Sequence, residues 1–223
     1  MRKLAIEVQD AIKQFTGLRL IHLENELLVS GLFTAFEKYK GELIEIDTFN
    51  IEIRFTKSYP FRFPLIKETG SKIPKNEDRH INSDGTLCLG NLQDEMRFCR
   101  SGITFKEFLI KILNPHLCRE YFRERRGYYP NGERSHGYEG IWETYYELLE
   151  TRDKKLIITE LDLILQNLNF EVRNKLCYCD SGKKYKRCHL IKKGPLLDIG
   201  VKNLRLIFQL LKDDFLKSKK GDI

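Results

Sequence analysis

Three of the chain's six cysteines fall within one short segment, Cys177 to His189, and this segment constrains the fold more than any other. A close pair, Cys177 and Cys179, is separated from the adjacent Cys188 and His189 by a segment that begins with the turn-forming residues Asp180 to Gly182. Three thiolates and one imidazole suit tetrahedral zinc, whereas three free cysteines would rarely gather beside a histidine by chance. Because protein side chains fill all four positions, we predict a structural zinc ion with the ligands Cys177, Cys179, Cys188 and His189.

The rest of the chain has the composition of a globular protein. A hydrophobic fraction of 41% over 223 residues supplies enough apolar surface for one ordinary domain and a small appendage. No run of about 18 apolar residues occurs, and the charged start MRKLAIEVQD lacks the apolar stretch of a signal peptide. We therefore expect a soluble cytoplasmic protein without a membrane segment.

The chain is basic, with 39 Lys and Arg residues against 32 Asp and Glu residues and a formal net charge of +7. This excess suits nucleic-acid binding, but it fits a mixed solvated surface better. The densest basic stretches are Arg119 to Arg126, Lys183 to Lys193 and Lys217 to Lys220. Each could equally contact an acidic protein partner, so charge alone does not indicate a nucleic-acid partner.

Periodicity predicts both helix and strand in the first part of the chain. Apolar residues recur at helical spacing from Leu4 to Phe15, where Thr16-Gly17 stops the pattern. Leu18 to Phe36 is typical of two short strands around a polar turn, and apolar residues alternate from Phe49 to Phe55. From Ser58 to Gly90, prolines and a Gly- and Asn-containing stretch predict a long irregular segment.

Helical patterns dominate the second part, at Thr104 to Leu113, Ile141 to Leu149, Leu156 to Leu168 and Leu204 to Phe215. The predicted fold class is therefore α+β. We expect an antiparallel meander sheet flanked by helices, followed by a small helical zinc-binding extension at the C-terminal end.

The segment Arg79 to Gly90 places Cys88 just beyond an Asp84-Gly85 turn, with His80 and Asn82 upstream. A thiol at this position can be a nucleophile, or it can be a small apolar side chain between two leucines. For Cys99 and Cys118 we favour a structural role. Cys118 lies near apolar helical residues, and Cys99 has no base nearby in the sequence.

The order of features along the chain favours the nucleophile. An opening helix and a meander precede Tyr59 to Pro64 (YPFRFP), His80-x-Asn82 and then Gly85-x-x-Cys88-Leu89. Over roughly residues 1 to 150, this order resembles the ubiquitin-conjugating enzyme family. The resemblance implies a UBC-like fold and a cysteine-dependent transferase that carries a protein as a thioester.

The resemblance also implies a role for each matching residue. Cys88 would be the thioester-forming nucleophile, Asn82 would shape the loop and support the oxyanion, and His80 would be mainly structural. The chain departs from the family's His-Pro-Asn tripeptide at Ile81, which stands in place of the proline. No cofactor is needed for acyl transfer to a thiolate.

A second histidine, His136, lies in a segment that eukaryotic members lack, Ser135 to Ile141. This segment resembles a His-Gly stretch of bacterial relatives. His136 is therefore a candidate acid/base or loop-shaping residue, and a histidine that binds backbone groups at a helix entry is an equally good interpretation.

The cysteine-rich segment resembles the SEC-C motif, known from the end of the protein-export ATPase, at every ligand of its Cys-x-Cys-x-Ser-Gly…Cys-His pattern. This second resemblance implies that the module docks a partner. We therefore predict a ubiquitin-conjugating-enzyme-like catalytic domain over residues 1–152. The predicted extension over residues 153–223 contains the SEC-C-like motif at 177–189.

The leading hypothesis is a bacterial conjugating enzyme that transfers a protein C-terminus from Cys88 to an amine. Bacterial relatives occur in antiphage operons, including the CBASS type, in which the modified protein is a cyclic-nucleotide synthase. A separate activating enzyme is an expected partner, because 223 residues show no adenylate-forming domain. The alternatives are a non-catalytic scaffold with the same fold and a nucleic-acid-binding adaptor that uses the zinc module.

Overall fold

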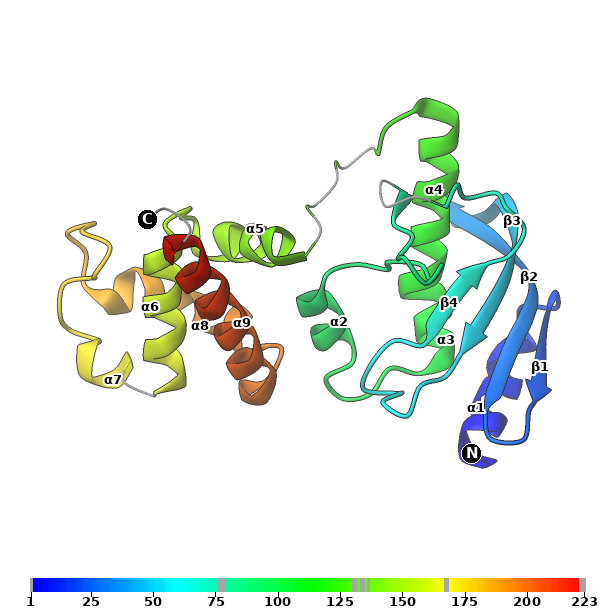
Figure 1. Cartoon of the computed structure of the whole chain (residues 1–223), viewed down its shortest axis with the longest axis horizontal. Coiled ribbons are helices and arrows are strands. Elements are labelled where there is room, and N and C mark those ends of the chain that lie inside the picture. The colour runs from blue at the N-terminus through cyan, green and yellow to red at the C-terminus, as the bar shows by residue number, and fades with distance from the viewer. Residues whose placement is uncertain are drawn as a thin grey trace. The chain divides into compact units, whose positions relative to one another are not determined.

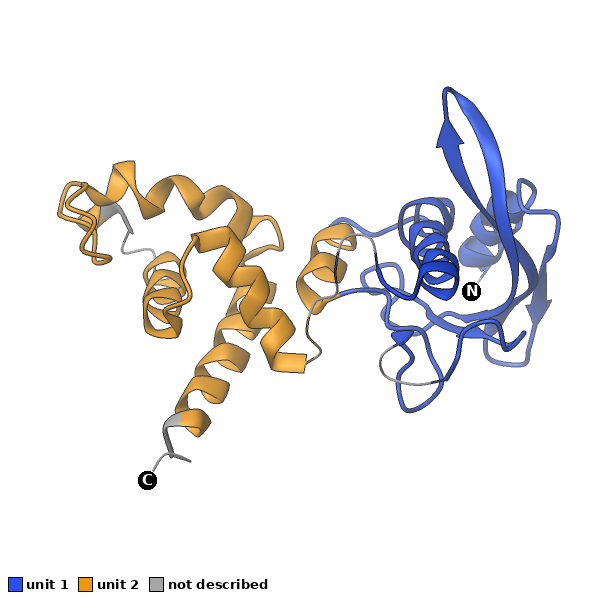
Figure 2. Ribbon diagram, turned by 90° about the horizontal axis from the view of Figure 1, so that it is seen from above, with its two compact units in different colours: residues 1–90, 101–133 blue, residues 91–100, 134–223 orange. Residues whose placement is uncertain are grey.

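The computed structural model describes residues 2–75, 79–129, 132, 135, 137–166 and 169–220, with only the backbone described at 169–170 and 219–220. The chain divides into two compact units, which Figure 2 shows in different colours. Unit 1 comprises residues 1–90 and 101–133, and unit 2 comprises residues 91–100 and 134–223.

Unit 1 contains an antiparallel sheet with the strand order β1-β2-β3-β4 (Figure 1). The strands are β1 Leu18–His22, β2 Leu27–Tyr39, β3 Glu42–Arg54 and β4 Leu65–Glu68. Strands β2 and β3 form a long hairpin, and both turn residues, Lys40 and Gly41, have positive φ angles of 50° and 93°. Two-residue hairpin turns require this conformation, because it matches the twist of the flanking strands. The predicted antiparallel meander is confirmed.

Helices cover the apolar side chains of this sheet. Helix α1 spans Arg2–Ile12, and a continuous helical stretch comprises α3 Phe105–Phe108, a π-helical segment Leu109–Leu113 and α4 Asn114–Arg126. Thr104 begins this stretch with a capping box, in which Thr104 and Glu107 bond to each other's backbone N–H groups. Helix α4 packs against β2 and β3. The α+β class expected from the sequence is confirmed.

One polar side chain joins α4 to the sheet at a β-bulge. The β2–β3 register shifts between Ala35 and Phe36, which disturbs the regular ladder there. Asn114, which is buried, accepts the Phe36 N–H at 2.8 Å and donates to the Phe36 carbonyl at 2.9 Å. The Asn114 amide thus supplies hydrogen bonds to both backbone groups of Phe36 and fixes the start of α4 on β2.

Two expectations are wrong in detail. The segment from Ser58 to Gly90 is not irregular throughout, because Leu65–Glu68 pairs with β3 as β4. The helix expected to end at Leu113 continues as α4 through the basic stretch to Arg126. In both places, tertiary partners stabilise a strand or helix that the local hydrophobic pattern does not predict.

Unit 2 is helical, with α2 Leu92–Phe98, α5 Gly137–Leu149, α6 Lys154–Leu165, α7 Asn169–Val172, α8 Lys193–Leu197 and α9 Val201–Lys220. Short 3-10 turns at Tyr185–Arg187 and His189–Lys192 follow the cysteine pair. The core is built mainly from α5, α6 and α9 and includes Trp142, Leu161 and Ile207. Trp142 donates its indole N–H to Asp214 of α9 at 2.8 Å. Among the described helices, none combines the length and the apolar character that crossing a membrane requires.

The compact units divide the chain differently from the predicted domains. Helices α2 and α5 belong to the same unit as the C-terminal helices, although both lie within residues 1–152. The assignment of catalysis to residues 1–152 and of an extension to residues 153–223 stays a prediction.

We predict that Asn114→Leu destabilises the protein by about 2 kcal/mol, because two partly buried backbone groups at Phe36 lose their partners. Urea denaturation followed by circular dichroism measures this change. The matched control is Asn50→Leu, at an exposed position of β3, which should cost less than about 1 kcal/mol. Equal effects of the two substitutions would contradict the bridging role of Asn114.

Candidate functional site

Cys88 lies in a non-regular segment that backbone hydrogen bonds hold on two sides. The Leu87 N–H donates to the Ile66 carbonyl of β4 at 2.8 Å, and the Cys88 N–H donates to the His80 carbonyl at 2.6 Å. Ile81 and Leu87 form an isolated antiparallel bridge between the two arms of this segment, one before the Asn82–Thr86 turn and one after it. The Cys88 side chain is half-buried, whereas Leu87 beside it is buried. The thiol is therefore placed by a fixed backbone and is partly open to solvent.

A tight turn closes the two arms between Asn82 and Thr86. The Asn82 N–H donates to the Thr86 carbonyl, and the Gly85 N–H donates to the Asn82 carbonyl, both at 2.8 Å. Gly85 has a φ of 81°, a conformation that glycine adopts without strain. The Asn82 side-chain amide donates to Thr86 Oγ1 at 3.0 Å. Asn82 thus shapes the loop, and its support of an oxyanion stays a prediction.

Asp84 stabilises the same turn from its exposed side. Its carboxylate accepts the Thr86 N–H at 2.9 Å and the Thr86 hydroxyl at 2.6 Å. These two hydrogen bonds lower the pKa of the Asp84 carboxyl below its ordinary value. The turn that precedes Cys88 is consequently held by side-chain as well as backbone contacts.

His80 packs against the helix behind the loop. Its ring lies 5.4 Å from the Tyr129 ring and 6.5 Å from the His116 ring, measured between centroids. Burial, together with the neighbouring Arg119 and His80, lowers the pKa of His116 to about 3. His116 is therefore neutral at physiological pH. The His80 ring occupies a packed position, which is consistent with the structural role that the family resemblance implies.

Two other cysteines, Cys99 and Cys118, are less suited to nucleophilic chemistry. Cys99 is 2% exposed. Cys118 of α4 is half-buried and donates to the Phe36 carbonyl at 3.5 Å. Burial raises the pKa of Cys118 to about 11, so its thiol stays protonated at neutral pH.

The four predicted metal ligands meet in unit 2. Their ligand atoms all lie within 4.8 Å of one another. His189 Nδ1 is 3.2 Å from Cys177 Sγ and 3.4 Å from Cys188 Sγ, and the Cys179 and Cys188 sulfurs are 3.6 Å apart. Metal–sulfur bonds of about 2.3 Å in a tetrahedron require sulfur–sulfur separations of about 3.8 Å. The donor set and its spacing therefore fit one tetrahedral metal ion.

The local backbone explains why these ligands converge. Asp180 and Gly182 adopt positive φ angles of 57° and 70°, which produces the predicted turn. Across this turn, the Cys177 N–H donates to the Lys183 carbonyl at 2.8 Å, and Leu176 bridges to Lys184. Burial raises the pKa of Cys177 to about 11, a cost that a bound cation would offset by stabilising the thiolate.

A buried carboxylate on α6 holds the cysteine-rich module in unit 2. Glu160 is fully buried and accepts hydrogen bonds from the Tyr178 and Tyr185 hydroxyls, the latter at 2.8 Å. Burial raises the pKa of Glu160, although the two phenols favour its charged form. Tyr178 lies between two metal ligands, and its ring is 5.0 Å from that of His189. The Cys/His cluster and α6 are thus joined through Glu160.

Some positions of the candidate sites were predictable from the sequence and others were not. The structure brings His80, Asn82 and Cys88 together in one loop and gathers the four candidate metal ligands in one cluster. His136 lies outside the described residues. Sequence reasoning missed Glu160, a carboxylate on an otherwise apolar helix face, which was the available signal.

Comparisons with known proteins found two similarities. A family model described as the SEC-C motif matches residues 173–190. A Danio rerio protein described as "Probable ubiquitin-conjugating enzyme E2 W-A" is 28% identical over 79 residues. The match covers 35% of this chain and 51% of that protein, so it spans about half the length of the curated relative. No solved structure matches the chain.

The chain therefore contains a SEC-C motif with a metal-competent Cys/His cluster, and it has weak similarity to an E2 ubiquitin-conjugating enzyme.

We predict that the wild-type chain binds about one metal ion and that chelation unfolds residues 173–190. Native mass spectrometry measures the metal content, and hydrogen exchange reports the order of the module. Cys188→Ala should lose the ion, whereas Cys118→Ala, at a cysteine outside the cluster, should retain it. A Cys188→Ala chain with full metal content would contradict the assignment.

We also predict an acid sensitivity that originates at His116. Its folded-state pKa of about 3 lies below the ordinary 6.5. Its contribution to the free energy of unfolding is therefore lost as pH falls from about 6.5 toward 3. Between pH 7 and pH 5, His116→Phe should lose less free energy of unfolding than wild type, by about 2 kcal/mol at most. The control His22→Phe, at an exposed histidine, should follow the wild-type pH dependence, measured by urea denaturation. Identical pH dependence in wild type and His116→Phe would contradict the assignment.

Proposed function

We propose that the chain is a ubiquitin-conjugating-like transferase that carries a protein C-terminus on Cys88 and delivers it to an amine. The observation that carries this proposal is the loop itself. Cys88 is half-buried and lies beside the His80 backbone, in the segment that Asn82 shapes. The similarity to an E2 enzyme and the α+β fold with an antiparallel meander support a UBC-like domain.

The chemistry requires two acyl transfers. In the first, the Cys88 thiolate attacks the thioester carbonyl that an activating enzyme presents, and that enzyme's thiol leaves. In the second, an amine attacks the Cys88 thioester, an amide bond forms, the Cys88 thiolate leaves and the nitrogen releases a proton. The fixed backbone around Cys88 contributes positioning, and Asn82 is the proposed oxyanion donor. His136 stays a candidate acid/base or loop-shaping residue.

The metal-binding module has a separate role in this proposal. Its four protein ligands leave no open position, so we assign a structural zinc ion held by Cys177, Cys179, Cys188 and His189. The SEC-C motif is proposed to dock a partner, which would bring the substrate or the activating enzyme to the transferase. Zinc would maintain the turn and the seat on Glu160 without taking part in acyl transfer.

The biological setting follows from the resemblance to bacterial conjugating enzymes. We propose a cytoplasmic role in antiphage defence of the CBASS type, in which the modified protein is a cyclic-nucleotide synthase. The partners would then be this synthase and a separate activating enzyme. A scaffold with an inert cysteine, or a nucleic-acid-binding adaptor, is the function to expect if the thiol carries nothing.

We predict a thiol-sensitive protein adduct on the wild-type chain when it is co-expressed with the genes that flank its own. Intact mass under nonreducing conditions detects this adduct. Cys88→Ser should convert it to an adduct that resists thiols, because an oxyester replaces the thioester. Cys118→Ser is the matched control within unit 1 and should behave as wild type. If wild type and Cys88→Ser both lack an adduct while metal content is retained, the scaffold function replaces the transferase.

A further inference from the structure

The Arg79–Ile81 arm determines where the backbone of Cys88 lies on one side of the loop. The His80 carbonyl accepts the Cys88 N–H at 2.6 Å, and Ile81 bridges to Leu87. This arm belongs to no described strand of the sheet. Its own position must therefore be set by contacts outside the β-ladder.

His80 adopts a backbone conformation that requires support. Its φ is 53°, in the left-handed region, which a residue with a β-carbon rarely occupies. Such conformations persist where the surrounding structure holds them, and they gather at functional sites. The orientation of the His80 peptide, and with it the acceptor for Cys88, thus depends on the neighbours of His80.

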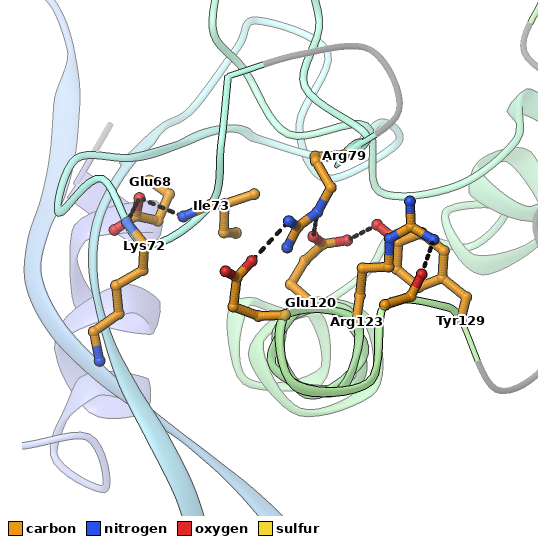
Figure 3. Close-up of polar contacts among 9 residues, drawn as sticks. Glu68, Lys72, Ile73, Arg79, Glu120, Arg123 and Tyr129 are labelled. Carbon is orange, nitrogen blue, oxygen red and sulfur yellow. Dashed lines mark hydrogen bonds and ion pairs between the residues drawn. The ribbon is translucent and has the colours of Figure 1, made fainter.

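Arg79 ties this arm to helix α4 through two carboxylates (Figure 3). Arg79 Nε is 3.2 Å from Glu120 Oε2, and Arg79 Nη1 is 2.8 Å from Glu124 Oε2. The Arg79 and Glu120 side chains are only 10% and 1% exposed, whereas Glu124 is 59% exposed. The ion pair with Glu120 is therefore the buried one. It holds Arg79, the residue directly before the strained His80 in the sequence.

Tyr129 joins the same group of contacts and completes a clamp around His80. Its hydroxyl donates to Glu120 Oε1 at 2.5 Å, and its ring lies 5.4 Å from the His80 ring at a tilt of 59°. Arg119 and Arg123 of α4 lie over the Tyr129 ring at 5.1 and 5.0 Å. We call Arg79, Glu120 and Tyr129 the clamp. Arg79 precedes His80 in the chain, and Tyr129 contacts the His80 ring, so the clamp holds His80 through both its backbone and its side chain.

Glu68 anchors the segment that leads from β4 toward this arm. Its buried carboxylate accepts the N–H groups of Gly70, Lys72 and Ile73 at 2.7, 3.0 and 3.4 Å, as Figure 3 shows for Ile73. Helix α4 is in turn fixed on β2 by Asn114. A chain of contacts therefore runs from the sheet through α4 and Arg79 to the Cys88 amide.

A buried ion pair contributes little net stability, because desolvation of both charges offsets their attraction. An apolar pair of similar volume would hold the fold as well. What an ion pair adds is geometry, since the guanidinium donors and the carboxylate oxygens fix direction as well as distance. This favours a positional role for the buried Arg79–Glu120 pair.

We propose that Arg79 is a positioning residue for Cys88. Its ion pair with Glu120 fixes the His80 carbonyl, the Cys88 amide and hence the direction of the thiol during acyl transfer. The inference rests on the proposed function for its effect on rate. Its effect on the Cys88 backbone is independent of any substrate.

The test uses the full-length double variant Arg79→Met with Glu120→Gln. It removes both charges together, so no unpaired charge is left buried, and the amide oxygen of the introduced glutamine can still accept from Tyr129. The matched control is Glu124→Gln, on the same helix at an exposed partner of Arg79. Hydrogen exchange of the peptide that contains Cys88 and the rate of thioester formation on Cys88 are measured for each chain.

In the double variant we expect exchange at the Cys88 amide to accelerate by at least about 10-fold, while β2 and β3 keep their protection. Thioester formation should slow by about 10- to 100-fold, because displacement of a nucleophile by about 1 Å costs this much. Glu124→Gln should stay within about 3-fold of wild type in both measurements. Arg79→Lys, which keeps the charge, should recover part of the rate.

Unchanged exchange at Cys88 would overturn the proposal, whether or not the rate falls, because Arg79 would not act through the loop backbone. General loss of protection in β2 and β3 would also overturn it, since Arg79 would then support the whole fold. A wild-type chain that forms no thioester contradicts the proposed function instead. The exchange measurement then still decides whether the clamp places Cys88.

Discussion

The loop that carries Cys88 depends on two backbone hydrogen bonds, from Leu87 to the Ile66 carbonyl and from Cys88 to the His80 carbonyl. The first bond fixes the loop to the edge strand β4. The second fixes it to an arm that Arg79 and Tyr129 hold on α4. Since the Asn82–Thr86 turn closes the two arms, the thiol has a defined position without belonging to a helix or strand. A rigid scaffold that presents a reactive group on a loop is a common arrangement at functional sites.

In unit 2, a tight turn likewise positions reactive side chains, here the candidate ligands of a metal ion. The Asp180–Gly182 turn brings the two pairs of ligands together, and the ligand distances fit tetrahedral coordination. The seat of the module is a buried carboxylate, Glu160, whose two tyrosine donors come from the module itself. A module of this size has little hydrophobic core of its own, so the hydrogen bonds to Glu160 support its order, and a bound metal ion would add to it.

Local patterns were sufficient to predict part of this structure. The cluster of candidate metal ligands follows from spacing alone, because Cys177, Cys179, Cys188 and His189 lie within one turn-forming segment. The hairpin of β1 and β2 follows from two apolar segments on either side of a polar turn. The helical character of α5, α6 and α9 likewise follows from apolar residues at helical spacing.

The missed features depend on contacts that are distant in sequence. Arg79 and Glu120 are 41 positions apart, and neither belongs to a motif that predicts their pairing. Asn114 has a role only because β2 bulges at Phe36, and β4 is a strand only because β3 offers it a partner. These groups acquire their roles through tertiary packing, which a single sequence does not encode in any local period.

We propose that Cys88, among the six cysteines, is the acyl carrier. The most direct measurement is peptide mapping of the wild-type adduct, prepared at low pH so that thioesters survive digestion. We predict that the C-terminal residues of the transferred protein are found on the peptide that contains Cys88, and that hydroxylamine releases them. An adduct mapped to Cys99 or Cys118, or joined to a lysine and resistant to hydroxylamine, would contradict it.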